Sequence, residues 1–113
     1  MERKNYEEKP LTTEEVVSAG VRTTVMRFGI EETEDGWECD ESCFNHKEPL
    51  TRDDYGKLVT HFIREKYSSD DEEAIRQNYL ESKTNKHKAE FAALKGWRER
   101  AKAMARTVLG IED

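Results

Sequence analysis

Apolar side chains recur at helical spacing throughout the second half of this chain, and that pattern most constrains its fold. From residue 51 onward they fall three or four positions apart, as on one face of an α-helix. The first stripe comprises Tyr55, Leu58, Val59, Phe62 and Ile63, and the last comprises Phe91, Leu94, Trp97, Ala101, Met104, Ala105 and Val108. Between them, Ser69 and Glu72 form a capping box, and Gly110 is placed to end the last helix. The pattern predicts three helices within residues 51–109.

Large aromatic rings must supply much of the core, because only 35% of the residues are hydrophobic and 39% are charged. A chain of 113 residues has the length of one domain. Residues 1–9 carry three acidic and three basic side chains and are expected to form a mobile arm. We therefore predict a single thin-cored domain over residues 10–113.

The first half combines one helix signal with one strand signal. Thr12 followed by Glu15 is a capping box, and it predicts a short helix that Gly20 terminates. The next stretch alternates β-branched and aromatic residues, and Gly36 closes a turn. It predicts a β-hairpin of residues 21–31 with 37–44, whose buried face is expected to hold Phe28, Ile30, Trp37 and Cys39. The predicted class is α+β, with an N-terminal short helix and β-hairpin before a three-helix C-terminal bundle.

Two cysteines and a histidine invite a zinc interpretation, but their spacing is unsuitable. On an extended strand, Cys39 and Cys43 would lie about 13 Å apart, which is too far to chelate one ion. A structural zinc site needs four ligands, and only His61 and His87 could join His46 in completing it. We interpret both thiols as half-buried strand residues, so neither a metal nor another cofactor is expected.

Other chemical motifs are equally weak in this sequence. The acidic segment 31–41 lacks the ligand order of a calcium loop, and His61 with Glu65 is best interpreted as a surface pair. The sequence contains no phosphate-binding loop, nucleophile elbow or paired-carboxylate motif. We therefore expect a protein that is not an enzyme, with no small-molecule substrate. The charged first residues and the lack of a long apolar run predict a cytoplasmic protein without a membrane partner.

Charge is distributed unevenly along the chain. Residues 31–48 contain eight acidic side chains opposed by one lysine, whereas residues 83–106 contain eight basic side chains and two acidic ones. The simplest interpretation is two solvated faces of opposite sign. A sharper interpretation is that the two regions dock on one another, or that the basic helix meets an acidic partner. The alternative function is nucleic-acid binding by the last helix, through Lys88, Lys95, Arg98, Arg100, Lys102 and Arg106. An overall net charge of −6 argues against that alternative.

Two blocks of the sequence carry a family resemblance. One runs from Leu58 to Asn78, and the other contains Phe91-x-x-Leu94-x-x-Trp97-Arg98-x-x-Ala101-Lys102. Together with Gly36-Trp37 and Phe44, they resemble the helical region of small tailed-phage and prophage proteins, including tail-fibre-associated and XkdW-like proteins. The resemblance covers about residues 36–105. It implies a structural or assembly role and transfers no catalytic residue.

These observations lead to a docking hypothesis. We expect a non-enzymatic interaction module of a phage or prophage, located in the host cytoplasm or associated with the virion. A strand edge and exposed aromatic rings would meet another protein or a second copy of the chain. The residues expected to take part are Tyr6, Arg22, Met26 and Trp37.

Overall fold

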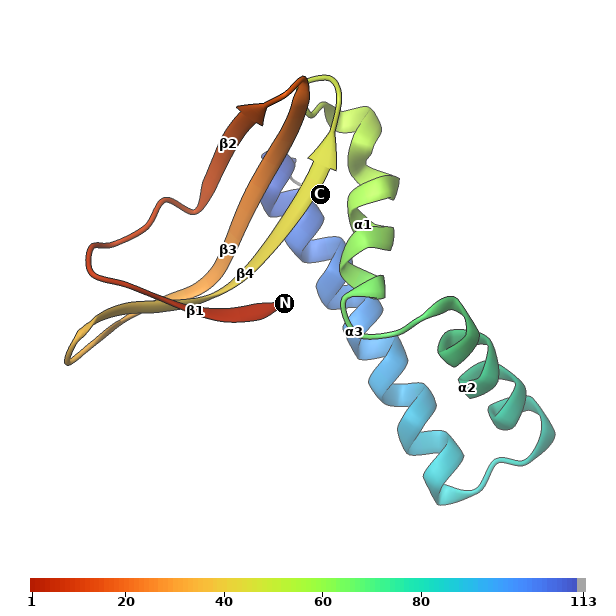
Figure 1. Ribbon diagram of the computed structural model, residues 1–113. Coiled ribbons are helices and arrows are strands. Elements are labelled where there is room, and N and C mark those ends of the chain that lie inside the picture. Colours follow the sequence, from red (N-terminus) through yellow and green to blue (C-terminus); the bar gives the residue numbers. More distant parts are fainter. Residues whose placement is uncertain (112–113) are drawn as a thin grey trace. The chain divides into compact units, whose positions relative to one another are not determined.

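A computed structural model describes residues 1–111, which contain a four-stranded antiparallel sheet and three α-helices (Figure 1). The predicted α+β class is confirmed, but strands rather than a helix come first. Contacts divide the chain into two compact units, Met1–Thr51 and Arg52–Asp113. Each unit is described by itself below. The last two residues of the domain predicted over residues 10–113 lie outside the described part.

The first unit is the sheet. Its strands are β1 (Glu2–Tyr6), β2 (Thr13–Ser18), β3 (Val21–Thr33) and β4 (Gly36–His46), arranged in the order β1-β4-β3-β2. All neighbouring strands are antiparallel. The predicted hairpin is confirmed as β3 and β4, which are the two central strands. The two edges of the sheet are therefore β1 and β2.

Both edge strands correct the expectations from sequence. Residues 1–9 were expected to be a mobile arm, yet they contain β1, which pairs with β4. Residues 12–20 were predicted to be helical, yet they contain β2 and a tight turn. Ala19 and Gly20 have φ values of 52° and 78°, as a type I′ hairpin turn requires at both central positions. The helix prediction was wrong because this turn and the pairing with β3 outweigh the local capping signal.

A β-bulge divides the predicted buried face of the hairpin. Phe28 lies opposite Asp40 and Glu31 lies opposite Glu38, so two residues between them face Cys39 alone. Gly29, at the bulge, has a φ of 61°. Because an extra residue reverses the alternation of side chains, Phe28 lies on one face of the sheet and Cys39 on the other. The prediction of one shared face was therefore wrong for Phe28, while Ile30, Trp37 and Cys39 share a face. Cys39 is fully buried, whereas Phe28, Ile30 and Trp37 are half-buried.

The second unit is helical. A short 3₁₀ turn (Arg52–Asp54) leads into α1 (Tyr55–Arg64), followed by α2 (Ser69–Glu81) and α3 (Asn85–Leu109). Both α1 and α2 contact α3, which is the longest element (Figure 1). The predicted stripes are confirmed by the buried side chains Leu58, Val59, Phe62 and Ile63 of α1 and Leu94, Ala101, Met104 and Ala105 of α3.

Capping interactions end these helices, and one side-chain hydrogen bond joins α1 to α3. The Ser68 hydroxyl accepts the N–H of Asp71 at 3.0 Å, so the α2 cap lies one residue before the predicted position. Gly110 ends α3 in a left-handed conformation, as predicted. Trp97 donates its indole N–H to the Phe62 carbonyl at 2.9 Å. This bond links α3 to the last turn of α1.

Candidate interaction surfaces

The outer strand β2 is the most exposed element of the sheet unit. All six of its side chains are exposed, and it pairs with β3 along one side only. Val16 and Val17 are 48% and 59% exposed and point to opposite faces. An exposed edge with apolar side chains is a template for pairing with another strand.

Hydrogen-bond alternation determines which backbone groups of β2 face outward. In a two-residue hairpin the flanking residues Ser18 and Val21 form a hydrogen-bonded pair. Counting back from Ser18, every second residue of β2 then bonds to β3 through its backbone. The bond from Arg27 N–H to the Thr12 carbonyl, at 2.8 Å, agrees with this alternation. Consequently the backbone N–H and C=O groups of Glu15 and Val17 point away from the sheet.

Arg27 holds this edge in place. Its side chain, only 7% exposed, donates to the Leu11 carbonyl at 2.9 Å, to Glu14 at 3.1 Å and to Glu41 at 3.2 Å. Its guanidinium also lies 5.0 Å from the centre of the Tyr6 ring. One cation therefore joins β1, β2, β4 and the segment between β1 and β2.

Tyr6 belongs to the same cluster. Its hydroxyl donates to the Glu41 carboxylate, with oxygen–oxygen distances of 2.8 and 2.9 Å. Burial and this hydrogen bond raise the pKa of the Tyr6 phenol above its ordinary value. The phenol therefore stays protonated and continues to donate at neutral pH. Its place in the cluster makes Tyr6 a structural tie between β1 and β4.

The other predicted docking residues are also occupied within the sheet unit. Arg22 bonds to Glu15 and to the Lys47 carbonyl. Met26 is fully buried and presents no surface to a partner, which corrects its proposed role. Trp37 is half-buried, with the Lys9 ammonium 5.4 Å from the centre of its ring. The exposed edge at β2 was missed, although its β-branched residues and the Ala19-Gly20 pair were signals for it.

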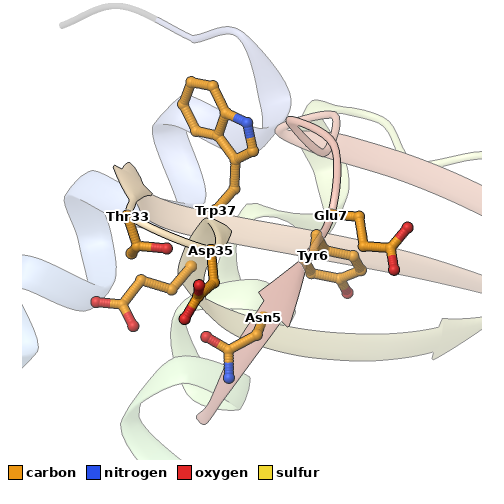
Figure 2. Close-up of a pocket in the computed structure, with 7 residues that line it drawn as sticks. Asn5, Tyr6, Glu7, Thr33, Asp35 and Trp37 are labelled. Atoms are coloured by element: carbon orange, nitrogen blue, oxygen red, sulfur yellow. The ribbon is translucent and has the colours of Figure 1, made fainter.

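A pocket of about 410 Å³ lies where the end of β1 meets the β3–β4 turn. It is lined by Asn5, Tyr6, Glu7, Thr33, Asp35, Trp37 and Glu38. The Trp37 indole projects away from the Asn5 and Asp35 side chains, so these groups do not converge on one point (Figure 2). A Cβ atom at Gly36 would lie 2.4 Å from the Tyr6 carbonyl oxygen, so only glycine permits this approach of β1.

The basic face of α3 is partly neutralised within the helical unit. Arg98 binds Glu72 at 2.6 Å, Lys102 binds Glu99 at 3.2 Å, and Arg106 donates to the Tyr55 hydroxyl at 3.4 Å. Arg100 is exposed. The six residues predicted for nucleic-acid contact are therefore not equivalent, because three of them already serve internal bonds.

Lys88 and Lys95 instead line an open groove of about 510 Å³ beside Tyr79 and Phe91. The two rings stack, with centroids 4.1 Å apart and planes 10° from parallel. Lys95 lies 5.7 Å from the centre of the Phe91 ring, and Lys83 lies 5.1 Å from that of Tyr79. The groove therefore combines aromatic surface with positive charge and suits an anionic ligand.

The thiols and histidines do not form a metal site among the residues that the structure describes. Cys39 is buried and Cys43 is exposed on the same strand, and burial raises the pKa of the Cys39 thiol. His46 accepts or donates at the Thr24 hydroxyl, 2.6 Å away. His61 lies 3.3 Å from Glu65, and burial lowers the pKa of its imidazole.

Comparison with protein-family models, curated proteins and solved structures finds no match to this chain. Within residues 1–111, none of the helices combines the length and the apolar character needed to cross a membrane.

Proposed function

We propose that this protein is a non-enzymatic interaction module whose β2 edge accepts a strand from another polypeptide. The observation that supports this most directly is the row of outward backbone groups at Glu15 and Val17, on a strand whose side chains are all exposed. Strand addition satisfies those groups with backbone hydrogen bonds, while flanking side chains select the partner.

The contrast between the two sheet edges favours β2 as the docking edge. β1 carries Arg3 and Lys4, and charged side chains are a common protection against strand addition. β2 contains neither a basic residue nor proline. The charges of Glu14 and Glu15 are compensated by Arg27 and Arg22, respectively. An incoming strand therefore meets apolar side chains and compensated carboxylates.

The biological setting that we propose is the assembly of a phage or prophage particle, most specifically its tail. The support for it is the resemblance of residues 36–105 to small tail-associated proteins. Identification of the genes beside this one tests the setting. Genes for portal, tape-measure or fibre proteins are expected there, whereas a metabolic operon would contradict it.

Strand addition is tested by substituting Val17→Pro. The N–H of Val17 points away from β3, so proline removes an outward donor without removing a bond to β3. Immobilised wild-type protein is expected to retain a partner that Val17→Pro does not retain. The partner is identified by mass spectrometry, and its binding should slow amide hydrogen exchange in β2. Circular dichroism verifies the fold of the variant.

Leu80→Lys is the matched control, because Leu80 is a 74% exposed apolar residue on α2. It should retain the partner as the wild type does. Loss of the partner with Leu80→Lys, together with retention by Val17→Pro, would contradict docking at β2.

A second candidate function is nucleic-acid binding by α3, which the groove beside Lys88 and Lys95 favours. Titration with duplex DNA across a salt series tests it, because released counterions make phosphate binding weaken steeply with salt. If both lysines contact phosphates, Lys88→Ala with Lys95→Ala should reduce the salt slope by about two units. Absence of binding at low salt would exclude this function.

A further inference from the structure

We propose that the strand added at β2 is β2 of a second copy of this chain, antiparallel about a twofold axis that passes through Val16. This inference rests on the proposed docking edge and specifies its occupant. Two sheet units would then form one continuous antiparallel sheet. The argument uses the hydrogen-bond phase of β2, the positions of its carboxylates and the character of the opposite edge.

The hydrogen-bond phase restricts the possible registers. Only Thr13, Glu15 and Val17 direct backbone groups outward, because the residues between them bond to β3. Antiparallel self-pairing must therefore match these residues with one another across the axis. The axis can pass through a residue of β2 but not between two residues.

Charge selects one of the remaining registers. An axis at Glu15 places that carboxylate opposite its own copy, and an axis at Glu14 does the same to Glu14, which is unfavourable. An axis at Thr13, Val17 or Ser18 leaves little of the strand paired, because β2 begins at Thr13 and ends at Ser18. The axis at Val16 pairs residues 14–18 of both copies and opposes no two carboxylates.

In this register the paired side chains are complementary. Val16 meets Val16 of the second copy at a non-hydrogen-bonded position, where opposed side chains are closest. Glu15 and Val17 form hydrogen-bonded pairs on both sides of the axis, and each pair exchanges two N–H···O bonds. Both copies therefore bury a valine that is 48% exposed in the single chain.

The assembly closes after two copies. Pairing at β2 leaves β1 as the edge at each end of the joined sheet. Arg3 of β1 is bound by Glu31, Glu38 and Asp40, and Lys4 is bound by Glu2. β1 has no aliphatic side chain to bury against another strand. A twofold interface uses the same patch on both copies, so it does not propagate into a fibre. The expected species is a dimer.

Opposite charges at Val16 provide the decisive test. In the whole 113-residue chain, Val16→Lys and Val16→Glu should each place two like charges at the axis and weaken the dimer about tenfold or more. An equimolar mixture of the two variants should form a heterodimer, because lysine then faces glutamate. Light scattering after size-exclusion chromatography measures the mass of each sample. Restoration in the mixture shows that both variants remain folded.

A disulfide tests the register itself. In a Cys43→Ser background, Val16→Cys should form an intermolecular disulfide under mild oxidation, because the two residues face each other at the axis. Thr13→Cys is the matched control on the same strand. It lies three residues from the axis, so two copies of it would be about 20 Å apart and should not cross-link.

The results that overturn the inference are specific. A wild-type protein that is monomeric at high concentration, a dimer unaffected by Val16→Lys, or a mixture that stays monomeric would each refute pairing at Val16. Cross-linking through Thr13→Cys but not Val16→Cys would refute the register. Failure here leaves capture of a different polypeptide at β2 intact, because the Val17→Pro comparison tests that separately.

Discussion

Arg27 illustrates how a single buried cation can organise several strands. Its guanidinium is enclosed by Glu14, Glu41 and the Tyr6 ring, and it is bound to a backbone carbonyl as well. As a whole, a buried ion pair of this kind adds little to the stability of the folded state, because its attraction is offset by the cost of removing both charges from water. Removing one partner is costly because it leaves the other charge buried and unpaired.

Replacing Arg27 by methionine should therefore destabilise the protein strongly. We expect the free energy of unfolding to fall by about 3 kcal/mol, because Glu41 would keep a carboxylate only 10% exposed without its cation. Arg22→Met is the matched control, since the Arg22–Glu15 pair is more exposed and should cost less than about 1 kcal/mol. Urea unfolding of both variants measures the difference, and equal losses would contradict this role of Arg27.

Gly36 is a second position where one residue is decisive. Gly36→Ala should lower the free energy of unfolding by about 2 kcal/mol, because φ is 143° and a Cβ atom would collide with the Tyr6 carbonyl. Gly96→Ala is the control; apart from its chain neighbours and the backbone of its own helix, no atom lies within 4 Å of its Cβ position. That change should stabilise α3 by about 1 kcal/mol. Thermal unfolding compares the two, and a tolerated Gly36→Ala would contradict the close approach of β1.

At the scale of elements, the sequence around β2 favours a helix locally, but pairing with β3 makes it a strand. A substitution at Ala19 should therefore change the stability in opposite directions in the expected helix and in the observed hairpin. In the I′ turn, alanine at a φ of 52° is strained, whereas asparagine is favoured.

Ala19→Asn should therefore raise the free energy of unfolding by about 0.5–1 kcal/mol. In a helix the same change would be destabilising, because asparagine is a weaker helix former than alanine. Chemical unfolding decides between the two, and a loss of stability would contradict the hairpin formed by β2 and β3.

Glu72 links the helices of the second unit through charge. It accepts from Arg98 at 2.6 Å and lies near Arg76 and Arg64 at 3.4 and 3.5 Å. Burial alone would raise the pKa of this carboxyl, but the three guanidinium groups outweigh burial and hold the pKa below its ordinary value. The ionised form is therefore favoured by folding.

The stability of the protein should consequently depend on Glu72 in a defined range of pH. Because its folded-state pKa is depressed, its contribution is complete above the unfolded-state pKa of about 4.3 and is lost as the pH falls through the folded-state pKa. Glu72→Gln should thus be less stable than the wild type at pH 7, with a smaller difference at pH 3. Urea unfolding at both values measures this, and a constant difference would contradict the linkage.

At the scale of the whole molecule, the two units differ in charge. Residues 1–51 contain thirteen acidic and six basic side chains, whereas residues 52–113 contain twelve and thirteen. The sheet unit thus carries a net charge of −7, and the helical unit carries a net charge of +1. Apolar pairing at β2, with Glu14 and Glu15 compensated internally, is a way for such an acidic unit to associate with itself.

Self-association makes thermal stability dependent on concentration, because a dimer that exists only between folded copies is favoured by mass action. Raising the protein concentration tenfold should raise the melting temperature of the wild type. The melting temperature of Val16→Lys should stay nearly constant. Calorimetry over a concentration series measures both, and parallel behaviour of the two proteins would contradict dimerisation through β2.

The helices and the central hairpin could be predicted from the sequence because their signals are local. A helix places residues three and four positions apart on one face, so the stripes of α1 and α3 could be recognised directly. Alternation before and after Gly36 similarly indicated β3 and β4. The backbone hydrogen bonds of a helix lie within the helix itself. Those of the hairpin join two strands that are separated only by a short turn.

Only the tertiary structure decided the edges of the sheet and therefore the candidate docking site. β1 finds its partner in β4, more than thirty residues away, and nothing in its own sequence specifies that pairing. The bulge at Gly29 depends on how two strands align, and Arg27 gains its role from groups on three strands. Such features arise from non-local hydrogen bonds and burial, whose partners become neighbours only when the chain folds.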